Sequence, residues 1–214
     1  MAGVFIVFEG PEGAGKSTQV ARLAGRLRDS GVDVVATREP GGTAFGESVR
    51  SILLAPGDHA MLPETEALLY AAARSQHVGE LVEPALARGA VVLCDRFVDS
   101  SLAYQSGGLG LPMADVVAIQ SLAMRGIEPD LRILLDLPIE VGLARRLGEP
   151  GEVNRLDLAG VAFHRRVRST YLALASARPD GWVVVDATAS PDHVGAVIAE
   201  AVGRLVAETG GSRR

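Results

Sequence analysis

Short segments that are apolar at every position constrain the fold of this chain more than any other feature. Residues 4–8, VFIVF, are apolar throughout, whereas a strand with one face in water would alternate apolar and polar residues. Such a strand is predicted to be buried on both faces, which is typical of a parallel sheet covered by helices on each side. Further strands of this kind are predicted at residues 32–36, 90–94, 131–135 and 182–185.

Long amphipathic segments separate these strands and are predicted to be helices. They lie at about residues 16–29, 45–54, 64–88, 113–125, 139–147, 157–177 and 191–207. Alternation of strands and helices indicates an α/β fold with three layers, α/β/α. The chain has no internal repeat and no linker-like segment, so we expect one domain over residues 1–208 and a disordered tail at residues 209–214.

Composition and charge exclude several classes of protein. The 214 residues are 48% hydrophobic and 22% charged, which excludes a disordered chain. The formal net charge is −5 and the one basic cluster is RRVR at residues 165–168, so no nucleic-acid-binding surface is expected. The longest apolar run is far shorter than the ~20 residues of a membrane-spanning helix, and no charged segment precedes it as in a signal peptide. We therefore expect a soluble, cytoplasmic protein without membrane contact.

Polar residues close the predicted strands. Each strand ends in, or is followed by, one such residue, and these are Glu9, Thr37, Asp95, Asp136 and Asp186. In an open parallel sheet, ligands bind beyond the carboxyl ends of the strands. We therefore expect the functional groups to gather along this edge of the sheet. The single cysteine, Cys94, and four dispersed histidines predict neither a disulfide nor a zinc site.

One loop at this edge carries a phosphate-binding motif. Residues 10–17, GPEGAGKS, match G-x-x-x-x-G-K-[ST] at every fixed position and lie between a predicted strand and a predicted helix. The backbone N–H groups of such a loop hold phosphate, its lysine reaches the β- and γ-phosphates, and its serine hydroxyl ligates Mg²⁺. The motif therefore indicates a bound nucleoside triphosphate. Its expected contacts are Gly10, Pro11, Glu12, Gly13, Ala14, Gly15, Lys16, Ser17 and Thr18.

Lys16 is the only lysine in the chain, and this fact sorts the classes of protein that share the motif. A GTPase would need an Asn-Lys-x-Asp motif to bind guanine, and this requires a second lysine. A motor or transporter ATPase is disfavoured because the strand at residues 90–94 is followed by Asp95 and Arg96, not by consecutive acids. An acid near the metal followed by an arginine suits transfer to an acceptor that already carries a phosphate. We expect Asp95, with Ser17, to lie near Mg²⁺.

Several segments resemble the bacterial thymidylate kinases, in the correct order from about residue 4 to residue 205. They are Glu12 within the loop, TREPGGT at residues 37–43, DRFVDSSLAYQ at residues 95–105 and DAT at residues 186–188. The resemblance implies a five-stranded parallel sheet with a short lid at about residues 145–156, and a homodimer. It also implies transfer of phosphate from Mg·ATP to dTMP, giving dTDP and ADP for the synthesis of dTTP.

The acceptor site is expected to combine arginines with a flat side chain. Arg38 and Arg96 are candidates for the acceptor phosphate because a guanidinium forms paired hydrogen bonds with it, and Arg50 is a weaker one. Tyr70 and Arg74 lie four residues apart and so share one helix face. This spacing alone favours a tyrosine in the core, whereas the resemblance implies that Tyr70 stacks on the base and Arg74 bonds to it. The full acceptor set is Arg38, Glu39, Pro40, Arg50, Tyr70, Arg74, Arg96, Ser101, Tyr104 and Gln105.

Charge stabilisation during transfer is expected to come from the loop and the lid. Glu12 is a carboxylate placed among phosphates, and our hypothesis is that it positions the acceptor. The resemblance implies lid arginines that close over the transferred group, for which Arg146 and Arg155 are the best candidates and Arg145 is the next. The predicted catalytic set is therefore Glu12, Lys16, Arg96, Arg146 and Arg155.

Two other functions remain compatible with the residues. One is a kinase for another nucleoside monophosphate or for a deoxynucleoside. The other is a regulatory module that binds ATP without transferring phosphate. Glu12, Arg38, Asp95 and Arg96 at one edge of the sheet count against a module that only binds.

Overall fold

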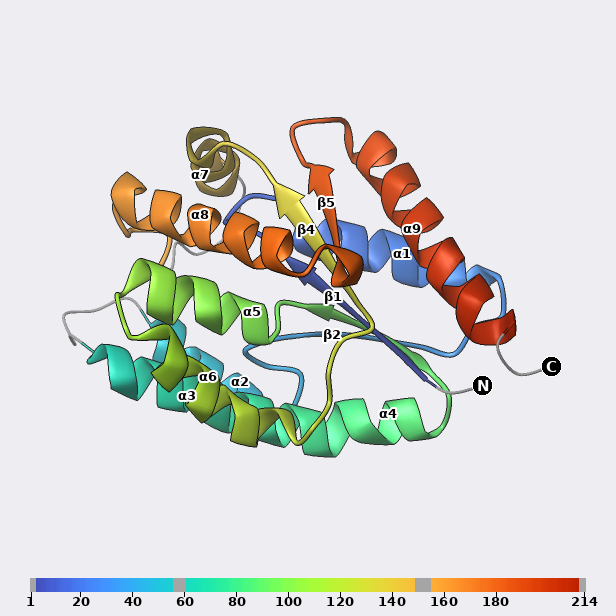
Figure 1. The fold of residues 1–214 in the computed structure, drawn as a ribbon, viewed down its shortest axis with the longest axis horizontal. Helices are drawn as coiled ribbons and strands as arrows, with labels where there is room; N and C mark the ends of the chain where they lie inside the picture. The colour runs from blue at the N-terminus through green and yellow to red at the C-terminus, as the bar shows by residue number, and fades with distance from the viewer. Residues whose placement is uncertain (1–2, 56–60, 149–154, 212–214) are drawn as a thin grey trace.

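The sheet is parallel throughout, and β1 lies at its centre. A computed structural model describes residues 3–55, 61–148 and 155–211 of the chain. Within these residues the sheet has five strands in the order β2-β3-β1-β4-β5 (Figure 1). They are β1 (Val4–Glu9), β2 (Val34–Arg38), β3 (Val91–Asp95), β4 (Leu131–Asp136) and β5 (Trp182–Asp186). This confirms the predicted α/β fold, although β2 begins and ends two residues later than predicted.

Helices fill the positions predicted for them. The differences are an additional helical segment after β3, a turn at residues 157–160 and a later end of the last helix. They are α1 (Lys16–Asp29), α2 (Ala44–Leu54), α3 (Pro63–His77), α4 (Glu83–Ala87), α5 (Val98–Ser101), α6 (Met113–Met124), α7 (Ile139–Gly148), α8 (Val161–Ala177) and α9 (Pro191–Gly211). A π-helical turn at Val78–Val82 joins α3 to α4, so residues 63–87 form one helical stretch where a helix was predicted at about residues 64–88. Residues 157–160 form a turn before α8, not the start of that helix.

A helical segment that the sequence pattern did not predict follows β3. It consists of α5 and a π-helical turn at Leu102–Gly108. Elsewhere in the chain, a short 3₁₀ turn at Pro179–Gly181 precedes β5. The segment DSSLAYQSGG has no apolar period of 3.6 residues, and its helical form depends on packing against α6 and α8. It carries three residues of the predicted acceptor set.

Two predicted boundaries meet the limits of the described residues. The helix α9 continues to Gly211, so residues 209–211 are helical where we expected a disordered tail, and residues 212–214 lie outside the described part. Residues 149–154, in the predicted lid, also lie outside it. In the described part of the chain, no helix combines the length and the apolar character needed to cross a bilayer.

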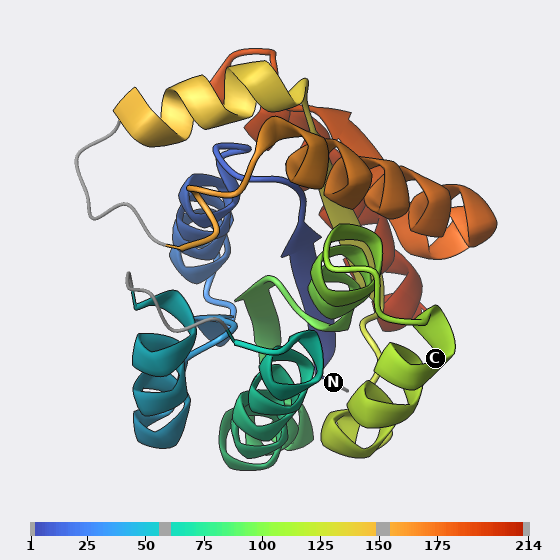
Figure 2. The ribbon, with the colours of Figure 1, turned by 90° about the vertical axis from the view of Figure 1, so that its left-hand side faces the viewer.

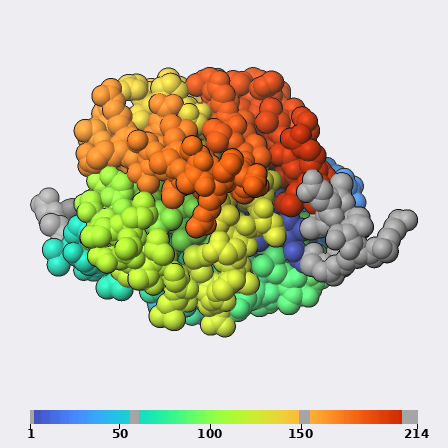
Figure 3. Space-filling model, in the orientation of Figure 1, coloured from blue at the N-terminus to red at the C-terminus, as the bar shows by residue number. Residues whose placement is uncertain are grey.

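Each face of β1 belongs to a different core. Val4, Ile6 and Phe8 pack with α1 and α9, whereas Phe5 and Val7 pack with the helical stretch around α4. Figure 2 shows the helices on both sides of the sheet, and Figure 3 shows how α8 (orange) and α6 (yellow-green) form much of one outer face. Burial on both faces is the reason that the strands are apolar at every position.

The loop after β1 is held against α7 by a close backbone contact. A Cβ atom on Gly142 of α7 would lie 2.4 Å from the carbonyl oxygen of Glu12, and one on Gly13 would lie 2.0 Å from that of Gly142. Gly13 also has a φ of 68°, a value that residues with a side chain rarely adopt. Two glycines therefore let the loop and α7 approach more closely than any other residues would.

This contact predicts opposite effects for two glycine-to-alanine substitutions in helices. Gly142→Ala should lower the free energy of unfolding by about 1–3 kcal/mol, because the new methyl group overlaps backbone atoms that cannot rotate away. Gly25→Ala in α1 is the matched control, because nothing lies within 4 Å of its added Cβ. It should raise stability by about 0.5–1 kcal/mol through helix propensity. Urea denaturation measures both, and a Gly142→Ala variant as stable as Gly25→Ala would contradict the contact.

Candidate active site

The loop at residues 10–17 curls around its own lysine. Lys16 is buried, and its Nζ donates hydrogen bonds to the carbonyl oxygens of Gly10 at 3.0 Å and Pro11 at 2.8 Å. Burial and the nearby Arg96 lower the pKa of Lys16 to about 8, against the opposing attraction of Glu12. Within the described residues, the direct hydrogen-bond partners of this ammonium group are backbone carbonyls of its own loop.

The two predicted metal residues lie in contact. Ser17, in the first turn of α1, donates a hydrogen bond of 2.5 Å from Oγ to Oδ2 of Asp95 at the end of β3. Hydroxyl and carboxylate oxygens are the ligands that Mg²⁺ prefers, with further oxygens from water and phosphate. Among the described residues, no cluster of three or more His, Cys, Asp or Glu could hold a metal by itself. This pair therefore fits a magnesium ion that takes its other ligands from a bound nucleotide and water.

Arginines converge on the cleft above the loop. The cleft has a volume of about 320 Å³, and the arginines in its lining are Arg38, Arg50, Arg96 and Arg146. Its lining also includes residues 12–18, Glu39 and Asp95. The predicted phosphate-binding and metal residues thus line the same cleft as these arginines.

Arg96 and Glu12 form an ion pair at the centre of this cleft. Nη2 of Arg96 lies 2.8 Å from Oε1 of Glu12, and the hydroxyl of Tyr104 donates to the same oxygen at 2.9 Å. Burial alone would raise the pKa of Glu12, but Arg96, Lys16 and Tyr104 together lower it to about 2. Glu12 is therefore a carboxylate at neutral pH, shared between a guanidinium and a phenol.

Glu9 and Tyr171 hold Arg96 in place, and no sequence pattern indicated either role. Arg96 has a φ of 71°, an uncommon conformation for a residue with a side chain. Directly after it, the backbone N–H of Phe97 donates to Oε1 of Glu9 at 2.9 Å. Oε2 of Glu9 accepts from the hydroxyls of Ser100 at 2.6 Å and Tyr171 at 3.0 Å. Complete burial, with a smaller effect of Asp99, raises the pKa of Glu9 to about 7.

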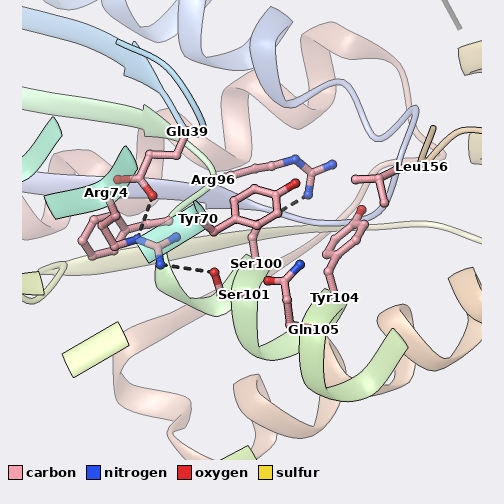
Figure 4. Close-up of a pocket in the computed structure, with 10 residues that line it drawn as sticks. Glu39, Tyr70, Arg74, Arg96, Ser100, Ser101, Tyr104, Gln105 and Leu156 are labelled. Carbon is pink, nitrogen blue, oxygen red and sulfur yellow. Dashed lines mark hydrogen bonds and ion pairs between the residues drawn. The ribbon is translucent and has the colours of Figure 1, made fainter. Parts of the chain in front are cut away.

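A second pocket opens beside the cleft and contains the predicted base-binding residues (Figure 4). Its lining is Glu39, Tyr70, Arg74, Arg96, Phe97, Ser100, Ser101, Tyr104, Gln105 and Leu156. Arg74 is almost completely buried, with Nε 2.8 Å from Oε2 of Glu39 and Nη1 3.2 Å from Oγ of Ser101. Its Nη1 also donates to Oε1 of Gln120, a partner that the sequence analysis missed. Tyr70 lines the pocket while it packs against the core between α2 and α3.

Gln105 presents an acceptor that the described residues leave unsatisfied. Its Nε2 donates to Oε1 of the buried Glu66 at 2.9 Å. Its Oε1 is buried and has no hydrogen-bond partner in the part of the chain that the structure describes. Buried acceptors are usually paired, so this amide oxygen can accept a hydrogen bond from water or from a ligand in the pocket that Gln105 lines.

The three lid arginines have separate surroundings. Arg146 lines the cleft above the loop, and its Nη2 lies 2.9 Å from Oδ2 of Asp157. Arg155 lies on the other side, in an ion pair with Glu66 of α3. Of the two predicted catalytic arginines of the lid, the structure therefore brings only Arg146 to the phosphate side, and places Arg155 beside the second pocket.

Arg145 borders another hollow on the far side of the loop. Its Nη1 donates to the carbonyl oxygen of Ala187 at 2.8 Å, within the predicted DAT segment. The hollow has a volume of about 350 Å³ and a largely apolar lining, which is Gly13, Ala14, Gly15, Thr18, Gln19, Arg145, Ala187, Ala189, Pro191 and Val194. It adjoins the loop at Gly13–Gly15, so it could hold the base of a nucleotide whose phosphates occupy the loop.

The remaining acceptor candidates contribute to the turn after β2. Glu39 and Pro40 are joined by a cis peptide bond. Arg38 pairs with Glu47 at 3.0 Å, and Arg50 donates to the carbonyl oxygen of Pro40 at 3.0 Å. Both guanidinium groups line the cleft while these partners fix their position.

Comparison with known proteins identifies the family. A family model described as thymidylate kinase matches residues 8–198. The thymidylate kinase of Thermomicrobium roseum is 53% identical over 204 residues, which cover 95% of this chain and 94% of that protein. That of Pseudomonas fluorescens is 51% identical over 194 residues, with coverage of 91% and 92%. A crystal structure of thymidylate kinase from Ehrlichia chaffeensis has a TM-score of 0.77 and 30% identity, over 95% of this chain and 99% of that one. The chain belongs to the thymidylate kinase family.

Proposed function

We propose that the protein transfers the γ-phosphoryl group of ATP to dTMP, giving dTDP and ADP. One observation carries this proposal: Arg96 and Glu39 line both the cleft above the phosphate loop and the pocket beside it. A donor and an acceptor bound in these two places would meet at Arg96. A module that only binds ATP has no need of the second pocket, and the comparisons support neither alternative function.

On the donor side, the chain provides a cradle for the triphosphate. The loop amides and Lys16 would hold the β- and γ-phosphates, and the hollow at Arg145 would receive the adenine. Ser17 and Asp95 would hold Mg²⁺, which would neutralise charge on the phosphate oxygens when bound. Transfer of this kind depends mainly on position and charge neutralisation, so these residues need supply no covalent chemistry.

On the acceptor side, Arg74 and Gln105 present a donor and an acceptor to the base. A guanidinium only donates, and Oε1 of Gln105, which has no partner among the described residues, only accepts. Thymine presents a carbonyl oxygen next to a ring N–H, which matches this order. Cytosine would place an amino group where Arg74 needs an acceptor. Tyr70 supplies the flat surface, and Arg38, Arg50 and Arg96 would bind the acceptor phosphate.

We also propose that two copies of the chain form a homodimer in the cytoplasm. The helices α2, α3 and α6 lie side by side along one flank of the sheet (Figure 2). They expose large apolar side chains to solvent, which are Phe45, Ile52, Leu68, Met113, Val117 and Leu122. Adjacent apolar side chains of this size favour a subunit contact over exposure to water.

The acceptor specificity can be tested with a panel of nucleoside monophosphates. An assay that couples ADP release to a detectable reaction should show turnover that depends on dTMP and on Mg²⁺. Because of the donor–acceptor order at Arg74 and Gln105, CMP should be at least about a hundredfold poorer in kcat/KM, as expected when buried polar groups of a site lose their partners. Higher activity with CMP than with dTMP would refute the acceptor, and no acceptor-dependent turnover would favour a binding module.

Removal of the Glu12 charge should impair use of the acceptor. Glu12→Gln keeps the size of the side chain but weakens its bonds to Arg96 and Tyr104. Hydrogen bonds to charged groups contribute about 1.5–3 kcal/mol, so kcat/KM for dTMP should fall by about 10- to 100-fold. Glu140→Gln is a matched control, because Glu140 is exposed and pairs with Arg165 outside the site. A value for Glu12→Gln within about twofold of wild type would contradict the role.

The two lid arginines should differ in which kinetic constant they change. Arg146→Ala should lower kcat by about a hundredfold, the loss typical of one donor that stabilises developing charge. Arg155→Ala should chiefly raise KM for dTMP, because Arg155 pairs with Glu66 beside the acceptor pocket. Arg204→Ala, at an exposed position on α9, serves as the control. Steady-state kinetics with each substrate in turn would separate these effects, and equal losses of kcat in both variants would contradict the assignment.

A further inference from the structure

His77 connects the strand β2 to the acceptor pocket through buried hydrogen bonds. The residue has no exposed surface and lies at the end of α3, three residues after Arg74. Its Nδ1 is 2.8 Å from Oε1 of Glu39, and its Nε2 is 2.8 Å from Oγ1 of Thr37. The other oxygen of Glu39, Oε2, accepts the hydrogen bond from Nε of Arg74. Thr37, His77, Glu39 and Arg74 therefore form one continuous chain.

We propose that His77 and Thr37 are positioning residues for the acceptor base. In this inference, which rests on the proposed function, they hold the Glu39 carboxylate in the orientation that aims Arg74 into the pocket. Neither residue lines the pocket, so neither touches the base. Their effect passes through Glu39 and Arg74 alone.

The chemistry of Glu39 explains why its Oε1 needs a hydrogen-bond partner other than Arg74. A free carboxylate and a guanidinium prefer to pair through two parallel hydrogen bonds. Here His77 occupies Oε1, so Arg74 pairs with Oε2 through Nε, and its Nη1 is directed to Ser101 and Gln120. Without His77, the vacant oxygen would attract a second guanidinium nitrogen and rotate Arg74 away from its present partners. An unpaired carboxylate oxygen at this depth would also be costly.

Thr37 fixes the ring that holds Glu39. Nδ1 of His77 bonds to Glu39, and Nε2 shares a hydrogen bond with the Thr37 hydroxyl, which can serve as donor or as acceptor. The turn after β2 closes around this contact. A Cβ atom on Gly42 would lie 2.5 Å from Oγ1 of Thr37 and 2.7 Å from Cδ2 of His77. The ring therefore has little room to rotate, and Arg38, the residue after Thr37 in β2, lines the phosphate cleft.

A kinetic comparison of isosteric variants tests the proposal. Thr37→Val removes the hydroxyl at nearly constant shape, and should raise KM for dTMP by about threefold or more. Thr37→Ser keeps the hydroxyl and should lie closer to wild type than Thr37→Val. His77→Leu should raise KM for dTMP by about tenfold or more, while His77→Asn, whose amide can still donate to Glu39, should recover part of that loss. In all four variants, KM for ATP and kcat at saturating dTMP should stay within about twofold of wild type.

The outcomes separate this proposal from a structural role and from the proposed function. His193→Leu, at an exposed position, controls for loss of a histidine, and thermal unfolding reports on folding. A fall in kcat together with a rise in KM for both ATP and dTMP would overturn the positioning role. An unchanged KM for dTMP in Thr37→Val and His77→Leu would also overturn it. If His77→Leu fails to fold, the two Thr37 variants decide. Absence of dTMP-dependent turnover in the wild type would instead overturn the proposed function, and this inference with it.

Discussion

The ion pair between Arg96 and Glu12 is the interaction on which the rest of the site depends. It joins the end of β3 to the phosphate loop after β1, the two neighbouring strands whose carboxyl ends form the cleft. A buried pair gains little from attraction alone, because both charges lose their water. Here Tyr104 and the Gly10 carbonyl add hydrogen bonds to the pair, so its partners are largely satisfied within the protein. The pair therefore fixes the boundary between the donor and acceptor sides.

Glu9 supports that pair by holding the backbone around Arg96 through hydrogen bonds. Arg96 adopts a left-handed conformation, which is unfavourable for a side chain of its size. The hydrogen bonds from the backbone of Phe97 and from Ser100 and Tyr171 to Glu9 hold the chain in this conformation. Local strain at a functional residue is thus sustained by a buried carboxylate on a neighbouring strand, as expected where geometry matters more than stability.

What the sequence pattern could predict depended on whether the signal was local. The buried strands, the phosphate loop and most helices were confirmed, because each is encoded within a short window of residues. The segment around Tyr104 was missed because its helical form arises from packing against α8, whose residues lie far along the chain. The bond between Glu9 and Tyr171 joins residues 162 positions apart, and no spacing rule predicts it. The charge of a residue at the end of an apolar strand was the only signal for Glu9.

The candidate site shows the same division. Ser17 and Asp95 lie in contact, because Ser17 starts the helix after β1 and Asp95 ends β3, and the carboxyl ends of these neighbouring parallel strands lie at one edge. The partner of Arg155 was not predictable, because Glu66 belongs to a helix that sequence alone does not place beside the lid. Roles in catalysis stay predictions for every residue of the set, while their positions are now defined. His77 was seen in the sequence only as one of four dispersed histidines.

The contact between Gly142 and the Glu12 carbonyl also bears on where the cationic end of α7 lies relative to the phosphate loop. Arg146 lies four residues after Gly142 in the same helix, which is about 6 Å of helix axis. Over this length, a difference of about 10° in the direction of the α7 axis would displace the backbone of Arg146 by only about 1 Å. A displacement of that size is comparable to the tolerance for productive alignment of reacting groups. One backbone contact near the start of α7 therefore limits the error in the position of Arg146 to about this tolerance, because so little helix lies between the two.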